Sequence, residues 1–176
     1  MGCARGGLLL EAGALGFEAS GLEPDPDLAR AAAEHSGRPV RAGTLADVLL
    51  APVSFDVITL FDGLQGLPDP GPTLRRLRMA LAPGGLLAVT VPDAGGPWAR
   101  ALGARWPLHD PRPGAVRFTR RTLARALGTA GFEGVTFRPA RTALTPGALL
   151  PAAWRSRAVW LPFGTLFALA RAPRLD

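Results

Sequence analysis

The stretch Met1-Gly2-Cys3-Ala4-Arg5-Gly6-Gly7, followed by the apolar run Leu8-Leu9-Leu10, predicts a glycine-rich turn that leads into a helix. Glycine has no Cβ, so such a turn lets the backbone approach a ligand closely and adopt φ values that other residues avoid. The first turn of the helix would direct unpaired N–H groups toward that ligand. Similar turns also begin ordinary helices, so this stretch alone indicates a nucleotide site only weakly.

The acidic residue Glu23 strengthens the nucleotide interpretation because of its distance from the glycines. It closes the segment 16–23 and is followed by Pro24. An acid at the tip of the second strand, roughly 20 residues beyond such a turn, can accept hydrogen bonds from both ribose hydroxyls of an adenosine ligand. Without the glycine turn, Glu23 would be interpreted as a surface acid that precedes a turn.

The composition indicates one globular domain and argues against a nucleic-acid partner. The chain has 176 residues, of which 48% are hydrophobic and 19% charged, enough to bury a sizeable core. It contains no Lys, Asn or Tyr but 22 Gly and 18 Pro, the residue set of GC-rich codons, so we expect a GC-rich bacterial source. The net charge of +6 follows from this use of arginine. The densest arginine groups, at 75–78 and 117–125, fit solvated helix faces, without the interleaved aromatic residues that stack on bases.

The single cysteine, Cys3, excludes an internal disulfide and a cysteine-based zinc cluster. A reducing cytosol therefore fits, and we expect a cytoplasmic protein without a metal site. The most apolar late stretch, from Ala158 to Ala170, is too short to span a membrane and contains Pro162 and Gly164. We therefore expect no membrane span.

Apolar periodicity and helix-capping residues predict alternating helices and strands. We expect helices at 8–15, at 26–36 with Asp25 as the cap, at 72–81, and from Thr119 to Gly131. Strands are expected to end at Glu23 and to span 40–45, 55–61, 86–92, 135–138 and 165–170, and a long loop spans 93–118. Residues 55–61 are apolar on both faces, as in a covered parallel strand. The pattern predicts a doubly wound α/β sheet.

The order of short motifs along the chain resembles one family, the class I S-adenosylmethionine-dependent methyltransferases. Each motif is loose, but their order is fairly specific and covers nearly the whole chain. After the glycine turn they are Leu22-Glu23-Pro24, Gly43-Thr44-Leu45-Ala46-Asp47, Ser54 to Asp62, Leu67-Pro68-Asp69-Pro70, Leu81-Ala82-Pro83-Gly84-Gly85, Val91-Pro92-Asp93, Arg105-Trp106-Pro107, Phe118-Thr119 and Ala130-Gly131-Phe132-Glu133.

This resemblance implies a Rossmann-like, mostly parallel sheet of seven strands, whose last strand, near 165–170, runs antiparallel. It implies S-adenosylmethionine as cofactor and one domain, 1–176, with a cofactor half at 1–92 and a substrate side at 93–176. The implied cofactor contacts are Gly2, Cys3, Ala4 and Gly6 for the methionine part, Glu23 and Pro24 for the ribose, Thr44 and Leu45 for the adenine edge, and Phe61 and Asp62 for the methionine end.

Catalysis of methyl transfer depends mainly on orientation, and a general base is needed only when the acceptor must first lose a proton. Where the resembled family often has Glu-His pairs, this chain has Gln65-Gly66 and Pro113-Gly114. His109, in the long loop, is the remaining candidate base, although a lone histidine is more often structural. Two alternatives stay open. One is a non-catalytic relative that binds S-adenosylmethionine. The other is a nicotinamide-dependent oxidoreductase, although this chain has no tyrosine and so lacks the catalytic tyrosine that such enzymes often use.

The methyl acceptor is expected to be a small molecule held by the segments 93–118 and 142–162. Trp98, Trp106, Trp154 and Trp160 lie in these segments and suggest an apolar or aromatic acceptor, or else they only cover the sheet.

The first strand of the resembled family is largely missing, because Met1 stands where that family's first strand ends. In the family that strand lies between the strands that here end near Glu23 and Phe61. We therefore expect the natural chain to begin upstream of Met1, and the chain that begins at Met1 to fold poorly and bind the cofactor weakly.

Overall fold

The computed structural model describes residues 2–110, 114–138, 142–144, 159–161 and 164–174. Its helices are α1 (Gly7–Ala14), α2 (Pro26–Ser36), α3 (Pro70–Ala80), α4 (Pro97–Leu102) and α5 (Arg120–Thr129), with short 3-10 turns η1 (Leu64–Gly66) and η2 (Gly103–Arg105). Its strands are β1 (Gly21–Glu23), β2 (Val40–Ala42), β3 (Phe55–Phe61), β4 (Leu81–Pro92), β5 (Glu133–Arg138), β6 (Thr142–Leu144), β7 (Val159–Leu161) and β8 (Thr165–Arg171).

The main sheet has the strand order β3-β4-β8-β5. Strands β3 and β4 are parallel, whereas β8 runs antiparallel to both β4 and β5. This arrangement confirms the predicted α/β fold and its late antiparallel strand. The single seven-stranded sheet that the resemblance implied is divided, because β1 and β2 form a separate parallel pair and β6 and β7 a separate antiparallel pair.

Local sequence signals fix the predicted helices. At α2, the Asp25 carboxylate accepts hydrogen bonds from the backbone N–H groups of Asp27 and Leu28 at 2.9 and 3.1 Å. At α5, Thr119 and Thr122 each accept a hydrogen bond from the other's backbone N–H, a reciprocal capping box. Gly37 ends α2 with a φ of 63°, a left-handed conformation that glycine adopts without strain.

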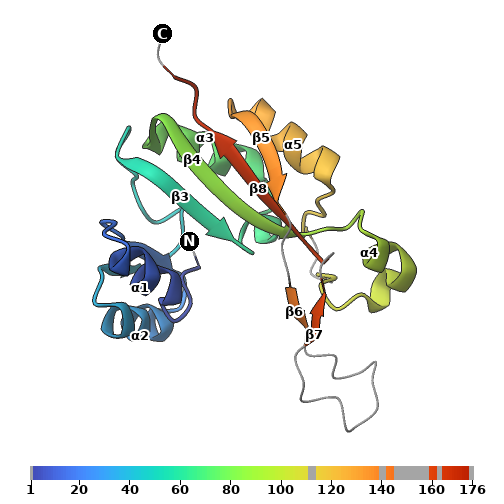
Figure 1. Ribbon diagram of the computed structural model, residues 1–176, viewed down its shortest axis with the longest axis horizontal. Helices are drawn as coiled ribbons and strands as arrows, with labels where there is room; N and C mark the ends of the chain where they lie inside the picture. Colours follow the sequence, from blue (N-terminus) through green and yellow to red (C-terminus); the bar gives the residue numbers. More distant parts are fainter. Residues whose placement is uncertain (1, 111–113, 139–141, 145–158, 162–163, 175–176) are drawn as a thin grey trace, which may run out of the picture.

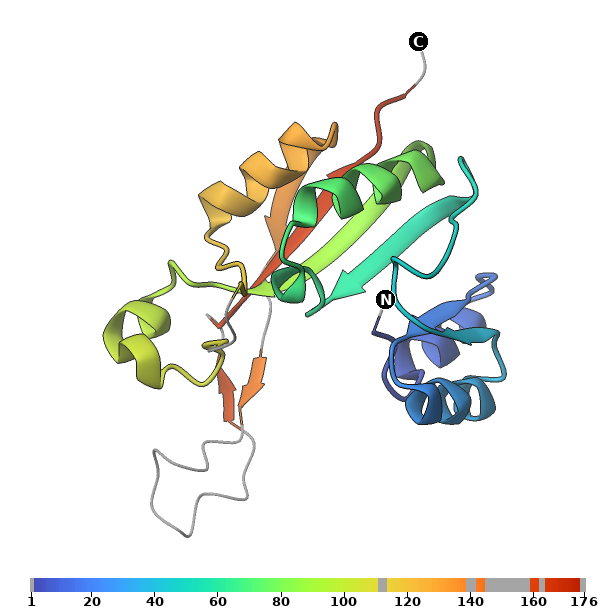
Figure 2. The same ribbon diagram turned by 180° about the vertical axis from the view of Figure 1, so that it is seen from behind.

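The hydrophobic core lies between the main sheet and two helices on one of its faces. Strand β4 contributes Leu87, Val89 and Val91, all fully buried. Helices α3 and α5 cover this face (Figure 2) and bury Leu74, Leu77, Leu123 and Leu127 against it. Within the described residues the opposite face carries no helix (Figure 1). The main sheet and these two helices thus form a two-layer unit.

Three predicted boundaries differ most from the structure. The connection 93–118 is partly helical, because Pro97 occupies the first helical position of α4, where a missing N–H is harmless. Strand β2 ends at Ala42 because Gly43 turns the chain with a φ of 133°. Strand β4 begins at Leu81, directly after α3, instead of at Leu86.

A groove of about 540 Å³ separates β1 from β3, whose facing edges do not pair within the described residues. Gly21 and Leu22 of β1 line one side, and Val57 to Leu60 of β3 the other. Val57 is 45% exposed, although its strand is apolar on both faces. At one end of the groove the Gly2 N–H donates to the Leu22 carbonyl at 2.9 Å, and a methyl group on Gly2 would lie 3.9 Å from the Phe61 carbonyl. Gly2 therefore lies between the carboxyl ends of both strands.

No helix among the described residues has the length and apolar character that crossing a bilayer requires.

We expect a further strand, joined directly to Gly2, to fill this groove and stabilise the fold. Replacing Met1 with a six-residue segment of Val, Ile and Leu should raise the free energy of unfolding by about 3–6 kcal/mol, because backbone groups on two strand edges become paired. The melting temperature should rise by roughly 10 °C or more.

Circular dichroism melting of both forms measures this change. The matched control is the same segment with proline at alternate positions, which cannot donate to a neighbouring strand. Equal melting temperatures for all three proteins would show that the groove does not accept a strand.

Candidate functional site

The glycine turn before α1 has a left-handed backbone at three alternate residues. Gly2, Ala4 and Gly6 have φ values of 67°, 47° and 78°. Ala4 is the notable member, because a residue with a Cβ rarely adopts this conformation. Strain of this kind persists where the surrounding structure enforces it and often marks ligand sites. The turn is therefore held in a specific shape.

The Glu23 carboxylate enforces that shape. It is only 7% exposed, accepts the Ala4 N–H on Oε2 at 2.9 Å and accepts the Asp25 N–H on Oε1 at 3.3 Å. A carboxylate oxygen has two lone pairs, so each Glu23 oxygen keeps one for a ligand hydroxyl. The carboxylate can thus both anchor the turn and accept from a ribose.

Gly6 has a packing role that the sequence does not reveal. A methyl group at this position would lie 2.7 Å from the Ala32 carbonyl oxygen of α2, too close for any side chain. Gly6 therefore lets the turn before α1 pack directly on α2. Its positive φ independently favours glycine.

The carboxyl end of β3 carries a second left-handed residue, Asp62, with a φ of 51°. The Asp62 N–H donates to the carbonyl and the hydroxyl of Thr90 at 3.1 and 3.0 Å, and the Asp62 Oδ1 lies 3.1 Å from that hydroxyl. Thr90 on β4 is a supporting residue that the sequence analysis did not identify. Beside it, Phe61 contacts Phe167 edge to face, with ring centroids 6.1 Å apart.

The other predicted cofactor residues are placed less favourably for side-chain contacts. The hydroxyl and the N–H of Thr44 both donate to Asp47 Oδ2 at 2.7 Å, and these bonds lower the pKa of Asp47. Leu45 is 7% exposed and belongs to the core. Pro24 is exposed, and Cys3 is half-buried. Gly43 donates its N–H to the Glu23 carbonyl at 2.9 Å, which ties this region to β1.

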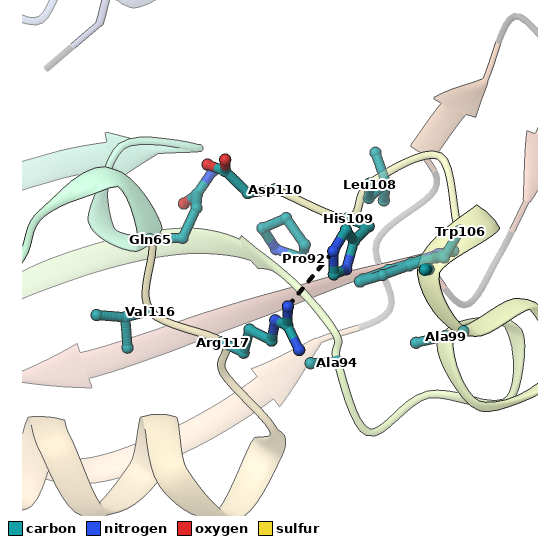
Figure 3. Close-up of a pocket in the computed structure, with 12 residues that line it drawn as sticks. Gln65, Pro92, Ala94, Ala99, Trp106, Leu108, His109, Asp110, Val116 and Arg117 are labelled. Carbon is teal, nitrogen blue, oxygen red and sulfur yellow. Dashed lines mark hydrogen bonds between the residues drawn. The ribbon is translucent and has the colours of Figure 1, made fainter. Parts of the chain in front are cut away.

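His109 lies apart from the glycine turn, in a cavity of about 350 Å³ near the carboxyl end of β4 (Figure 3). Its Nε2 is 3.4 Å from the Arg117 guanidinium. A guanidinium only donates, so this contact is a hydrogen bond when Nε2 is the ring nitrogen without a proton. Arg117, which the sequence placed on a solvated helix face, instead extends toward His109 in this cavity.

The tryptophans predicted around the acceptor have different environments. Trp106 is 6% exposed and lines the cavity, whereas Trp98 is 39% exposed on α4. Trp154 lies outside the described residues, and Trp160 belongs to the short strand β7. Of the candidate base positions, Gln65 lines the cavity and Pro113 lies outside the described residues.

A sequence model of one protein family, described as a methyltransferase domain, matches residues 1–136. The chain belongs to the methyltransferase-domain family. Its family and fold are those of a class I methyltransferase, whose methyl donor is S-adenosylmethionine. This assignment replaces the alternative of a nicotinamide-dependent oxidoreductase. No curated protein sequence matches the chain significantly.

Solved structures with the same fold are distant in sequence. A Thermotoga maritima protein, described as a possible histamine N-methyltransferase, is 20% identical with a TM-score of 0.69, and the match covers 98% of this chain and 79% of that one. A methyltransferase from Methanosarcina mazei is 16% identical with a TM-score of 0.68, covering 99% and 91%. Haemonchus contortus phosphoethanolamine N-methyltransferase 2, solved with S-adenosylmethionine, is 15% identical with a TM-score of 0.69, covering 98% and 47%.

Cys3 offers a direct test of cofactor binding at the glycine turn, because it is the single cysteine of this methyltransferase. Burial, and then the negative charge of Glu23, raise the pKa of the Cys3 thiol. Alkylation requires the thiolate, so iodoacetamide should react slowly at pH 8 and faster as the pH rises.

Saturating S-adenosylhomocysteine should slow this alkylation further, by about fivefold or more, because a ligand on the turn covers the reacting thiolate. Mass spectrometry of the labelled protein measures the rate, and the guanidinium-unfolded chain provides the unprotected reference. An unchanged rate at saturation would place the ligand away from Cys3.

Proposed function

We propose that the chain transfers a methyl group from S-adenosylmethionine to a small-molecule acceptor in the cytosol. Residues 1–92 would hold the cofactor, and residues 93–176 would hold the acceptor. The observation that carries this proposal is the buried Glu23 carboxylate, which fixes the strained Ala4 turn and keeps lone pairs for a ligand. A second strained residue, Asp62, lies at the end of β3, which Gly2 approaches.

Several residues have the chemistry to hold S-adenosylmethionine, which supplies an electrophilic methyl group when bound. Glu23 would accept hydrogen bonds from its ribose hydroxyls, with Pro24 beside it. The turn from Gly2 through Cys3 and Ala4 to Gly6 would bind its methionine part, together with backbone at Phe61 and Asp62. The segment at Thr44 and Leu45 would contact the adenine edge through backbone, because the Thr44 hydroxyl is bonded to Asp47.

The chain's contribution to the reaction would be orientation and exclusion of water. His109 Nε2 would act as a base only after releasing Arg117, because the Arg117 guanidinium lies 3.4 Å from it. Two of the structural neighbours are described as N-methyltransferases or possible ones, and amines need no prior deprotonation by the protein when they react as the free base. These descriptions support a small amine as the acceptor.

A non-catalytic relative that binds S-adenosylmethionine is the second candidate. It is favoured by the neutral amide of Gln65 at a position where related enzymes often carry an acid. Cofactor binding without turnover of any amine would support it.

Replacing Glu23 with Ala should weaken S-adenosylmethionine binding about ten- to a hundredfold, because hydrogen bonds to a charged group contribute roughly 1.5–3 kcal/mol. Isothermal calorimetry measures this affinity, with NADH as the competing dinucleotide, which should not bind. The matched control is Glu18→Ala, because Glu18 is exposed.

Glu23→Gln separates the two roles of the carboxylate. A glutamine oxygen can still accept the Ala4 N–H, so the melting temperature should stay closer to that of the unmodified chain while cofactor affinity falls. Unchanged affinity in both Glu23 variants would remove Glu23 from the binding site.

A further inference from the structure

Two buried side-chain atoms lack a hydrogen-bond partner within the described residues, and both belong to residues that line the same cavity. They are Gln65 Oε1 and Trp106 Nε1, and the cavity is the one near the end of β4 that also contains His109 (Figure 3). Leaving buried polar atoms unpaired is unfavourable, so each such atom in a native fold needs an explanation. The two atoms are complementary: the oxygen can only accept and the indole N–H can only donate.

The orientation of the Gln65 amide is fixed by its neighbours. Its Nε2 donates to the Asp62 carbonyl at 2.8 Å, so a flipped amide would place two oxygen acceptors together. The Gln65 backbone carbonyl accepts the Val116 N–H at 2.9 Å, which anchors the residue to the segment before α5. Gln65 Oε1 is therefore held as an acceptor, three residues beyond Asp62, where we place the methionine end of the cofactor.

The backbone of Trp106 is also held in place by two hydrogen bonds. The Trp106 N–H donates to the Gly103 carbonyl at 3.1 Å, and the Trp106 carbonyl accepts the His109 N–H at 2.9 Å. The side chain is 6% exposed. Solvent does not reach this N–H, and a molecule bound in the cavity that Trp106 lines would satisfy it as the ring shifts toward that molecule.

We propose that this cavity binds the methyl acceptor, and that the acceptor is a small amine that also carries a hydrogen-bond-accepting oxygen or nitrogen. Its N–H group donates to Gln65 Oε1, and its accepting atom receives the Trp106 indole N–H. This proposal rests on the proposed methyltransferase function. The cavity volume of about 350 Å³ suits a molecule with one small ring.

The chemistry of Gln65 favours nitrogen over a hydroxyl oxygen as the attacking atom. An amide cannot take up a proton at neutral pH, whereas a hydroxyl must lose one to become a strong nucleophile. The free amine attacks with its own lone pair: the N–C bond forms, the C–S bond of the sulfonium breaks with its electron pair going to sulfur, and the nitrogen gains a positive charge. One proton then passes from nitrogen to water. The Gln65 oxygen stabilises the N–H as this charge develops.

The probe for this site is 4-(aminomethyl)pyridine, which has an amine and a ring nitrogen that accepts. Tryptophan labelled with ¹⁵N at the indole gives one resonance per ring, and Trp106→Phe identifies the Trp106 resonance. With S-adenosylhomocysteine present, the probe should shift the Trp106 indole resonance to saturation. Benzylamine, which lacks the accepting ring nitrogen, should bind roughly two- to tenfold more weakly.

Gln65→Met keeps the length of the side chain but removes its oxygen. It should lower the binding affinity of the probe by a similar two- to tenfold factor. Trp98→Phe is the matched control, because Trp98 does not line the cavity, and should leave probe affinity unchanged. Should Gln65→Met disturb folding, Trp106→Phe followed by calorimetry with the same probe gives the second measurement, with the same expected loss.

The result that overturns the proposal is an unshifted Trp106 resonance at saturating probe, or equal affinity for the probe and benzylamine. Methyl transfer to 4-(hydroxymethyl)pyridine in preference to the amine would also overturn it. The proposed function fails separately, when calorimetry shows no binding of S-adenosylmethionine, because the probe titration repeated without S-adenosylhomocysteine reports on the cavity alone.

Discussion

The bond between the Glu23 carboxylate and the Ala4 N–H organises the cofactor side of this protein. A charged side chain that is only 7% exposed is costly to bury unless hydrogen bonds satisfy it, and here two backbone N–H groups do so. The same bond holds Ala4 in a left-handed conformation that an alanine does not favour. The shape of the turn and the burial of the acid thus depend on each other.

Parallel strands explain why the candidate site residues gather at one edge. Glu23 ends β1, Phe61 ends β3 and Pro92 ends β4. Hydrogen bonds between Asp62 and Thr90 link the ends of β3 and β4, and Gly2, bonded to the Leu22 carbonyl, lies near the end of β3. Loops that leave these ends can hold a ligand while the strands stay rigid. The cavity with Gln65 and Trp106 follows directly beyond the ends of β3 and β4, so the two predicted halves of the site adjoin through Asp62.

A groove divides the sheet between β1 and β3. Strand β3 has apolar side chains on both faces, yet Val57 is half-exposed beside the groove that separates it from β1. Four residues of the buried core, Leu45, Val48, Leu60 and Leu77, also line this groove. The cofactor turn lies at its end, because Gly2 is positioned between the two strand ends. A strand that filled the groove would therefore support both the core and the turn.

The sequence by itself determined the order of elements, the caps at Asp25 and Thr119, the antiparallel last strand and the family, because these depend on local hydrogen bonding and on short motifs in order. The end of strand β2 was misjudged and the helix α4 was not predicted, since a single glycine or proline decides them, and the strands β6 and β7 were not predicted. Only the tertiary structure decided that Gly6 serves helix packing, that Thr90 supports Asp62, that Arg117 meets His109, and that Gln65 shares a cavity with Trp106. Apart from Arg117 and His109, these contacts join residues far apart in the chain, and their geometry follows from how the sheet, helices and loops pack rather than from any local pattern.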